Sequence, residues 1–124
     1  MWSLSLQPEC MGQFKKWHKK HKKELQAVTN NLDTYLKALN DGQKPRATHF
    51  GFLHVEQEGV MAIDQKGAGQ NALETRLYVY PDEATNQLFV ITLGDKGSQS
   101  RDVAKSRDFS RAIRKAAELT TSRE

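Results

Sequence analysis

The sequence is poor in cysteine and in long apolar runs, and each shortage excludes a class of protein. Cys10 is the single cysteine, so no internal disulfide can form, and the chain suits a reducing compartment. No stretch approaches the roughly 18 consecutive apolar residues of a membrane-spanning helix, so we expect no membrane association. The first residues show no cationic segment followed by an apolar run, so we expect no secretory signal and a cytoplasmic location.

Size and charge bound the remaining possibilities. A chain of 124 residues makes one compact domain, which we place at residues 1–124. Hydrophobic residues make up 37% of the chain, enough for one modest core. Lysine and arginine total 19 against 15 aspartate and glutamate residues, and the net charge of +4 favours an anionic partner. We expect no small-molecule cofactor.

The first long segment has a helical pattern. Hydrophobic side chains recur at steps of three and four over residues 11–40, and Asp41-Gly42 ends the pattern. A single helix of this length is long for so small a domain. Residues 9–40 therefore form either one continuous helix or a helical hairpin with a break within residues 19–23.

Four stretches have the composition of β-strands, and a second helical pattern closes the chain. Residues 2–6 alternate between apolar and polar side chains, the period of a half-buried strand. The other predicted strands are 60–63, 73–80 and 87–93, and the last helix covers residues 98–119. Segment 43–58 has no clean period and indicates an irregular or briefly extended connection. The order β-α(-α)-β-β-β-α predicts an α+β domain with an N-terminal helical hairpin and a C-terminal helix.

Six lysines fall within nine residues of the first helical segment: Lys15, Lys16, Lys19, Lys20, Lys22 and Lys23. Such a run predicts a salt-sensitive contact with the phosphates of a nucleic acid. A solvated helix face, with its apolar stripe turned inward, is the alternative. His18 and His21 lie three residues apart, but a zinc site needs three or four ligands, so we expect no metal site there.

The stretch 74–80 presents an arginine beside two phenols. Strand alternation places Arg76, Tyr78 and Tyr80 on one face of the sheet, away from the two apolar residues between them. On an open face, a guanidinium group can clamp a phosphate while aromatic rings stack on unpaired bases. An outer sheet face that simply carries polar and amphipathic residues is the alternative.

A more specific pattern follows the apolar run at residues 88–93. Over residues 94–102 the chain reads Gly-Asp-Lys-Gly-Ser-Gln-Ser-Arg-Asp and then enters the last helix. The succession of Arg-Leu-Tyr-Val-Tyr, an apolar strand and Gly-Asp-Lys-x-x-Gln-x-Arg-Asp is similar to the end of RelE/ParE-superfamily toxins. Within that superfamily it looks closest to the HigB-like addiction module killer branch. The resemblance covers most of the chain and is sharp over residues 73–103.

The resemblance implies a twisted antiparallel sheet with helices packed against one face. It also implies the toxin component of a type II toxin–antitoxin system, acting as a metal-independent and sometimes ribosome-dependent mRNA endoribonuclease (an mRNA interferase). The alternatives are a non-enzymatic, ParE-like inhibitor of DNA gyrase, or a degenerate relative that binds only nucleic acid or an antitoxin-like protein. The implied partners are a cognate antitoxin, mRNA and the ribosome.

The resemblance also assigns residue roles. Arg76 matches the strand arginine that faces the RNA backbone, and Lys96 and Arg101 are second cations at the start of the helix. His54, Tyr78 and Tyr80 are the candidates for proton transfer, with a purely structural role as the alternative for His54. The basic residues along the last helix that suit ribosomal RNA are Arg101, Lys105, Arg107, Arg111, Arg114 and Lys115.

Two positions depart from the pattern of the toxin branch. The strand after Val60 runs Met-Ala-Ile-Asp, so Asp64 stands near the place of an arginine in a Glu-x-Arg motif. Val103 stands near the place of a tyrosine that many ribonuclease members carry. Losing both groups would weaken transition-state stabilisation by several kcal/mol unless other groups substitute, so catalysis is the open question.

Overall fold

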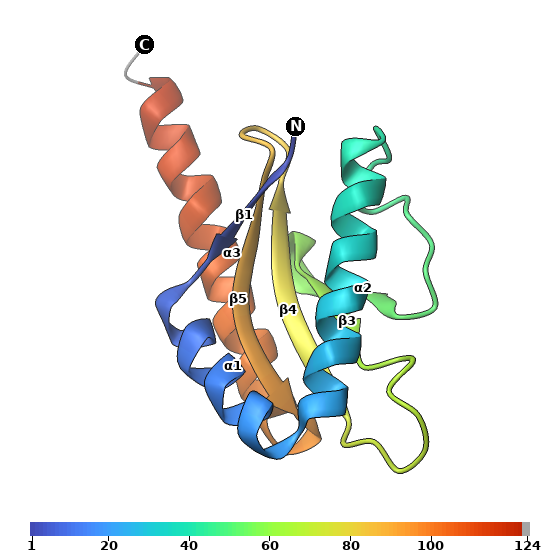
Figure 1. The fold of residues 1–124 in the computed structure, drawn as a ribbon. Helices are drawn as coiled ribbons and strands as arrows, with labels where there is room; N and C mark the ends of the chain where they lie inside the picture. Colours follow the sequence, from blue (N-terminus) through green and yellow to red (C-terminus); the bar gives the residue numbers. More distant parts are fainter. Residues whose placement is uncertain (123–124) are drawn as a thin grey trace.

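The computed structural model describes residues 1–122. Its strands are β1 (Ser3–Leu6), β2 (Leu53–Val55), β3 (Met61–Asp64), β4 (Thr75–Asp82) and β5 (Gln87–Asp95). Its helices are α1 (Pro8–Lys20), α2 (Lys22–Asn40) and α3 (Gln99–Ser122), with short 3-10 helices η1 (Gln57–Gly59) and η2 (Lys96–Ser98). The predicted α+β class is confirmed, and β2 is a strand within the connection that had no clean period (Figure 1).

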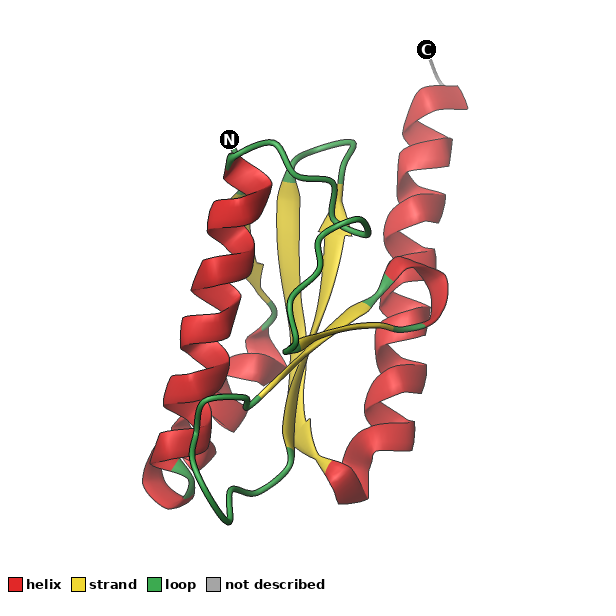
Figure 2. Cartoon of the chain, turned by 90° about the vertical axis from the view of Figure 1, so that its right-hand side faces the viewer, coloured by secondary structure: helices red, strands yellow, loops and turns green. Residues whose placement is uncertain are grey.

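The five strands form one sheet in the order β1-β5-β4-β3-β2. Strands β2 to β5 form an antiparallel meander, whereas β1 pairs parallel with β5. The sheet is therefore mixed, because the chain leaves β1 through two helices and re-enters the sheet at its opposite edge. Helices also cover both faces instead of one: the sheet lies between α2 and α3 (Figure 2).

Residues 9–40 form the helical hairpin. Helix α1 ends at Lys20, and His21 leaves helical geometry with φ −139° and ψ 54° before α2 begins. The break lets both helices turn an apolar stripe toward the sheet, which one straight rod could not do. Trp17 and Glu24, on either side of the break, are both buried, and Glu24 accepts a hydrogen bond from the Leu73 amide at 2.8 Å.

The main core lies between the helical hairpin and one sheet face. Its largest fully buried members are Tyr35, Leu39, Met61, Ile63, Leu77, Leu88 and Leu93. The face under α3 is different, because its cluster contains only Val60, Ala62 and Tyr78 with Val103 against them. On α3 itself, Asp102, Ser106 and Ser110 are buried at successive helical turns. The contact between α3 and the sheet therefore combines buried polar side chains with a small apolar cluster and an edge-on ring contact between Phe89 and Phe109.

The segment most similar to the toxin superfamily forms the corner between β5 and α3. Asp95 caps η2 by accepting from the Ser98 amide at 3.1 Å, and the Ser98 hydroxyl donates to Asp102 Oδ2 at 2.6 Å. A Cβ on Gly94 would lie 2.0 Å from Asp102 Oδ2, so only glycine fits there. Burial raises the pKa of Asp102, and the hydrogen bond from Ser98 lowers it by a smaller amount. The segment thus has a structural role, because it turns the chain into α3.

Candidate functional site

A polar cleft lies beside η2, where β3 and β5 end and β4 begins. It holds about 170 Å³ and is lined by Asp64, Gln65, Glu74, Arg76, Asp95, Lys96 and Gln99. Arg76 and Lys96, which were both predicted from the sequence, therefore line one site. The other lining groups include three carboxylates, so the cleft is not simply cationic.

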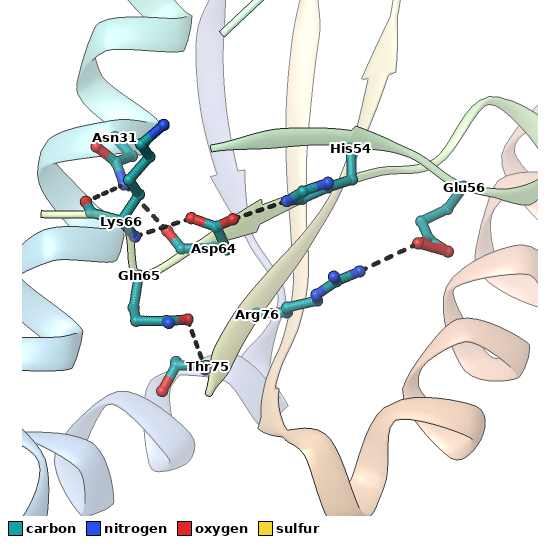
Figure 3. Close-up of polar contacts among 8 residues, drawn as sticks. All are labelled: Asn31, His54, Glu56, Asp64, Gln65, Lys66, Thr75 and Arg76. Carbon is teal, nitrogen blue, oxygen red and sulfur yellow. Dashed lines mark hydrogen bonds and ion pairs between the residues drawn. The ribbon is translucent and has the colours of Figure 1, made fainter. Parts of the chain in front are cut away.

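Arg76 lies in the middle of the sheet, opposite Asp64 on β3 and Gly94 on β5. Its guanidinium group forms an ion pair with Glu56 at 3.5 Å, and 32% of the side chain is exposed (Figure 3). The space beside Gly94 is filled by Ser98 and Asp102, so the guanidinium is reachable only through the exposed part of its own side chain. Arg76 is thus available to an anion that takes the place of Glu56.

His54 is bound to an acid. Strand β2 pairs His54 with Ala62 of β3, which brings His54 Nε2 within 2.7 Å of Asp64 Oδ2 (Figure 3). The other oxygen of Asp64 accepts from the Lys66 amide at 2.8 Å. A carboxylate partner places the proton on Nε2 and leaves Nδ1 as the acceptor. His54 is therefore an oriented histidine, and Asp64 has a defined partner.

The two phenols do not lie on an open sheet face, and this part of the sequence interpretation is wrong. Tyr78 is 1% exposed and Tyr80 is 7% exposed, because α3 covers the face onto which they project. Burial raises the pKa of Tyr78 to about 12, which removes it as a proton carrier near neutral pH. Stacking on RNA bases is likewise closed to both rings in this arrangement.

The remaining predicted cations differ in their surroundings. Lys96 lies 4.0 Å from Glu74 and is largely exposed. Arg101 is exposed and lines a second cleft, of about 270 Å³, together with Lys16 of the first helix. Asp95 lines both clefts, so the two are neighbours.

The lysines of the helical hairpin are all exposed, as a solvated or nucleic-acid-binding face requires: Lys15, Lys16, Lys19, Lys20, Lys22 and Lys23. Lys23 also donates to the Gln70 carbonyl oxygen at 2.9 Å. Lys105 is different, because its ammonium group contacts Glu9 and its side chain is mostly covered. Burial lowers the pKa of Lys105, and the contact with Glu9 engages its amino group within the protein.

A larger hollow, of about 550 Å³, lies near Tyr80, toward the other end of β4. Glu58 borders it with a left-handed backbone (φ 57°) and binds Arg111 and Arg114 of α3. The two arginine hydrogen bonds hold the pKa of Glu58 below its usual range. Two of the basic residues of the last helix thus fasten α3 to η1 through ion pairs, while their side chains stay about half exposed.

The described residues contain no cluster of metal-ligating side chains. Across residues 1–122, no three His, Cys, Asp or Glu side chains gather closely enough to hold a metal ion. Cys10 is fully buried, and burial raises the pKa of its thiol to about 12. None of the helices in residues 1–122 combines the length and apolar character needed to cross a membrane.

Sequence reasoning did not find Glu56, Gln65, Glu74 or Asp95 as neighbours of Arg76. Glu56 lies in a stretch without a clean period, and its approach to Arg76 depends on the pairing of β2 with β3. Glu74 and Asp95 meet only through the cross-strand register that sets Thr75 opposite Asp95. The one available signal was Asp64, which stood out as a departure from the toxin pattern.

Among known proteins, a solved structure has a similar fold. No protein-family model matches the sequence, and no curated protein sequence does either. The fold is similar to a chain in the crystal structure of the heterotetrameric YoeB–YefM toxin–antitoxin complex from Staphylococcus aureus. The likeness has a TM-score of 0.44 at 13% identity and covers 74% of this chain and 93% of the other. At this level it assigns neither an activity nor a partner to this chain.

Proposed function

We propose that this chain is the toxin of a type II toxin–antitoxin pair and acts on mRNA through the cleft around Arg76. The observation that carries the proposal is the meeting of Arg76 and Lys96, twenty residues apart in sequence, in one cleft. Both belong to the stretch that resembles RelE/ParE toxins. A neighbouring cleft adds Lys16 and Arg101, so cations continue from the sheet toward the basic hairpin.

Cleavage of RNA without a metal needs three groups. A base takes the proton of a 2′-hydroxyl, a cation stabilises the charge on the phosphorus oxygens, and an acid protonates the leaving 5′-oxygen. Arg76 supplies the cation, and the exposed ammonium group of Lys96 at the rim adds a second charge and donates the proton to the leaving 5′-oxygen. His54 supplies the base, because Asp64 fixes its tautomer and leaves one ring nitrogen as an acceptor. The products are a 2′,3′-cyclic phosphate and a free 5′-hydroxyl end.

Glu56 sets the order of events in this scheme. In the free protein it neutralises Arg76 from 3.5 Å. An RNA phosphate binds Arg76 only by taking the position of the Glu56 carboxylate. The free protein is thus held in a weakly binding state until RNA displaces this acid.

A second candidate function is inhibition of DNA gyrase or simple binding without chemistry. It is favoured by the three carboxylates in the cleft and by Asp64 in place of an arginine. It is also favoured by the burial of Tyr78, which removes the phenol predicted to transfer protons.

Induced expression in a bacterial host separates these functions. We expect growth arrest together with new, codon-linked 5′ ends in mapped mRNA. Arrest with intact mRNA and cleaved DNA would support gyrase inhibition instead. Growth without arrest, with the protein folded and present at the level of the inactive control, would contradict any toxin role. Arrest relieved by co-expression of the adjacent gene would support a cognate antitoxin.

A further inference from the structure

The outermost strand β1 has an unprotected edge. Strand β1 lies at one end of the sheet and reads Ser-Leu-Ser-Leu, with no charge and no proline within it. Proteins usually guard such an edge with charges, prolines or bulges, because an unguarded edge pairs with another strand. Six large hydrophobic residues are exposed among the described residues, and four lie in the first eleven positions: Met1, Leu4, Leu6 and Met11.

The parallel ladder decides which backbone groups face outward. The Ser3 amide donates to the Asn86 carbonyl, and the Gln7 amide donates to the Val90 carbonyl. In a parallel pair, alternate residues bond to the neighbouring strand, so residues 3, 5 and 7 face β5. The N–H and C=O groups of Leu4 and Leu6 therefore point away from β5, and both residues are 40% exposed.

We propose that β1 pairs antiparallel with β1 of a second copy, about a two-fold axis through Ser5. Leu4 of one copy then lies opposite Leu6 of the other, and each such pair exchanges two backbone hydrogen bonds. Ser5 lies opposite Ser5 as a pair without backbone bonds. The two sheets join into one continuous sheet, with the four leucine side chains adjacent on the same face.

The register follows from the sequence of the strand. A two-fold axis keeps the sheet faces aligned only when residues of the same parity lie opposite each other. An axis through Leu4 would place Leu6 opposite Trp2, whose amide already donates to Asn40 Oδ1 at 2.7 Å. The axis through Ser5 uses all the outward groups of Leu4 and Leu6. The strand is thus complementary to itself, which points to a second copy as its occupant.

The opposite edge of the sheet provides a contrast. Strand β2 carries His54, which is paired with Asp64, and is followed directly by Glu56. These charged groups disfavour the pairing of another strand with this edge. Its exposed Val55 makes a matched position for substitution. Each copy carries a net charge of +4, so added salt screens the repulsion and strengthens pairing. Nucleic-acid binding responds to salt in the opposite direction.

Analytical ultracentrifugation over a concentration series tests the pairing. We expect the purified chain to move toward twice its mass of 14.1 kDa as concentration rises, and to do so more readily in higher salt. Leu4→Lys and Leu6→Lys place a charge on the edge and should keep the chain monomeric. Val55→Lys on the other edge should leave association unchanged. A wild-type chain that stays monomeric at every concentration overturns the proposal. This holds even if a strand of another protein binds to the β1 edge instead.

Disulfide trapping tests the register without relying on lysine variants that could misfold. Facing residues in a pair without backbone bonds bring their Cβ atoms to about 4.5 Å, within reach of a disulfide. Ser5→Cys should therefore cross-link rapidly on oxidation. Ser3→Cys should not, because the two Ser3 positions lie roughly 13 Å apart along the strands. Cys10 is fully buried and does not compete. Equal cross-linking of the two variants would exclude this register.

Discussion

Arg76 is the residue on which the proposed chemistry depends. We expect Arg76→Ala to lower RNA cleavage by about 100-fold or more, because it removes the charge that stabilises the transition state. Stability should change by less than about 1 kcal/mol, since the ion pair with Glu56 is partly solvated. Mapping of mRNA ends and urea unfolding of the same variant check both statements. Arg76→Lys is the matched control and should retain part of the activity.

If Arg76→Ala remained fully toxic, the cleft would not be the site of action. Loss of toxicity together with loss of folding would not support the assignment either, so the unfolding measurement decides between the two explanations. Retained folding with abolished cleavage is the expected combination.

Glu56 is the residue that opposes the binding of an anion by Arg76. Replacing it with glutamine removes the negative charge at 3.5 Å and keeps the shape of the side chain. We expect Glu56→Gln to strengthen binding of a short single-stranded RNA by up to about fivefold, measured by fluorescence anisotropy. Glu83→Gln, which removes an exposed acid outside the cleft, should have no effect. Weaker binding by Glu56→Gln would show that Glu56 positions Arg76 and does not compete with RNA.

At the scale of elements, the corner between β5 and α3 depends on the absence of a side chain at residue 94. An added methyl group would meet Asp102 Oδ2 at 2.0 Å and Ser98 Oγ at 2.3 Å. We expect Gly94→Ala to lower the unfolding free energy by about 1–3 kcal/mol through overpacking. Gly12→Ala is the control: it lies in α1 with open space around it, and should raise stability by about 0.5–1 kcal/mol. Urea unfolding of the two variants gives the comparison.

A Gly94→Ala variant as stable as the wild type would mean that the corner can shift, and the close packing of Asp102 would then explain nothing about this segment.

The helical hairpin likewise combines local and distant contacts. The break at His21 involves only neighbouring residues. The contacts around it come from distant segments, because Glu24, just beyond the break, accepts a hydrogen bond from the Leu73 amide.

For the whole molecule, charge decides how nucleic acid is approached. The exposed lysines of the hairpin contact phosphates and release counterions, so binding must weaken as salt rises. Changing Lys19, Lys20, Lys22 and Lys23 to glutamine should reduce the log–log salt slope for single-stranded RNA by up to about 3. Changing Lys37 and Lys44, which are paired with acids elsewhere, should leave the slope nearly unchanged. An unaltered slope in the first variant would identify the lysine run as a solvated helix face.

The sequence by itself determined the α+β class and the corner at residues 94–102, and it left a hairpin with a break within residues 19–23 as one of two alternatives for residues 9–40; the structure decided for the hairpin. These predictions depend on local periodicity, on charge repulsion among neighbours and on turn chemistry, which short segments carry within themselves. Only the tertiary structure decided that α3 covers Tyr78, that β1 pairs parallel with β5, and that Glu56 neutralises Arg76. Strand alternation separates two faces but does not say which element will cover either one. Arg76 was therefore predictable as a residue of interest, while its surroundings depended on contacts between segments far apart in the chain.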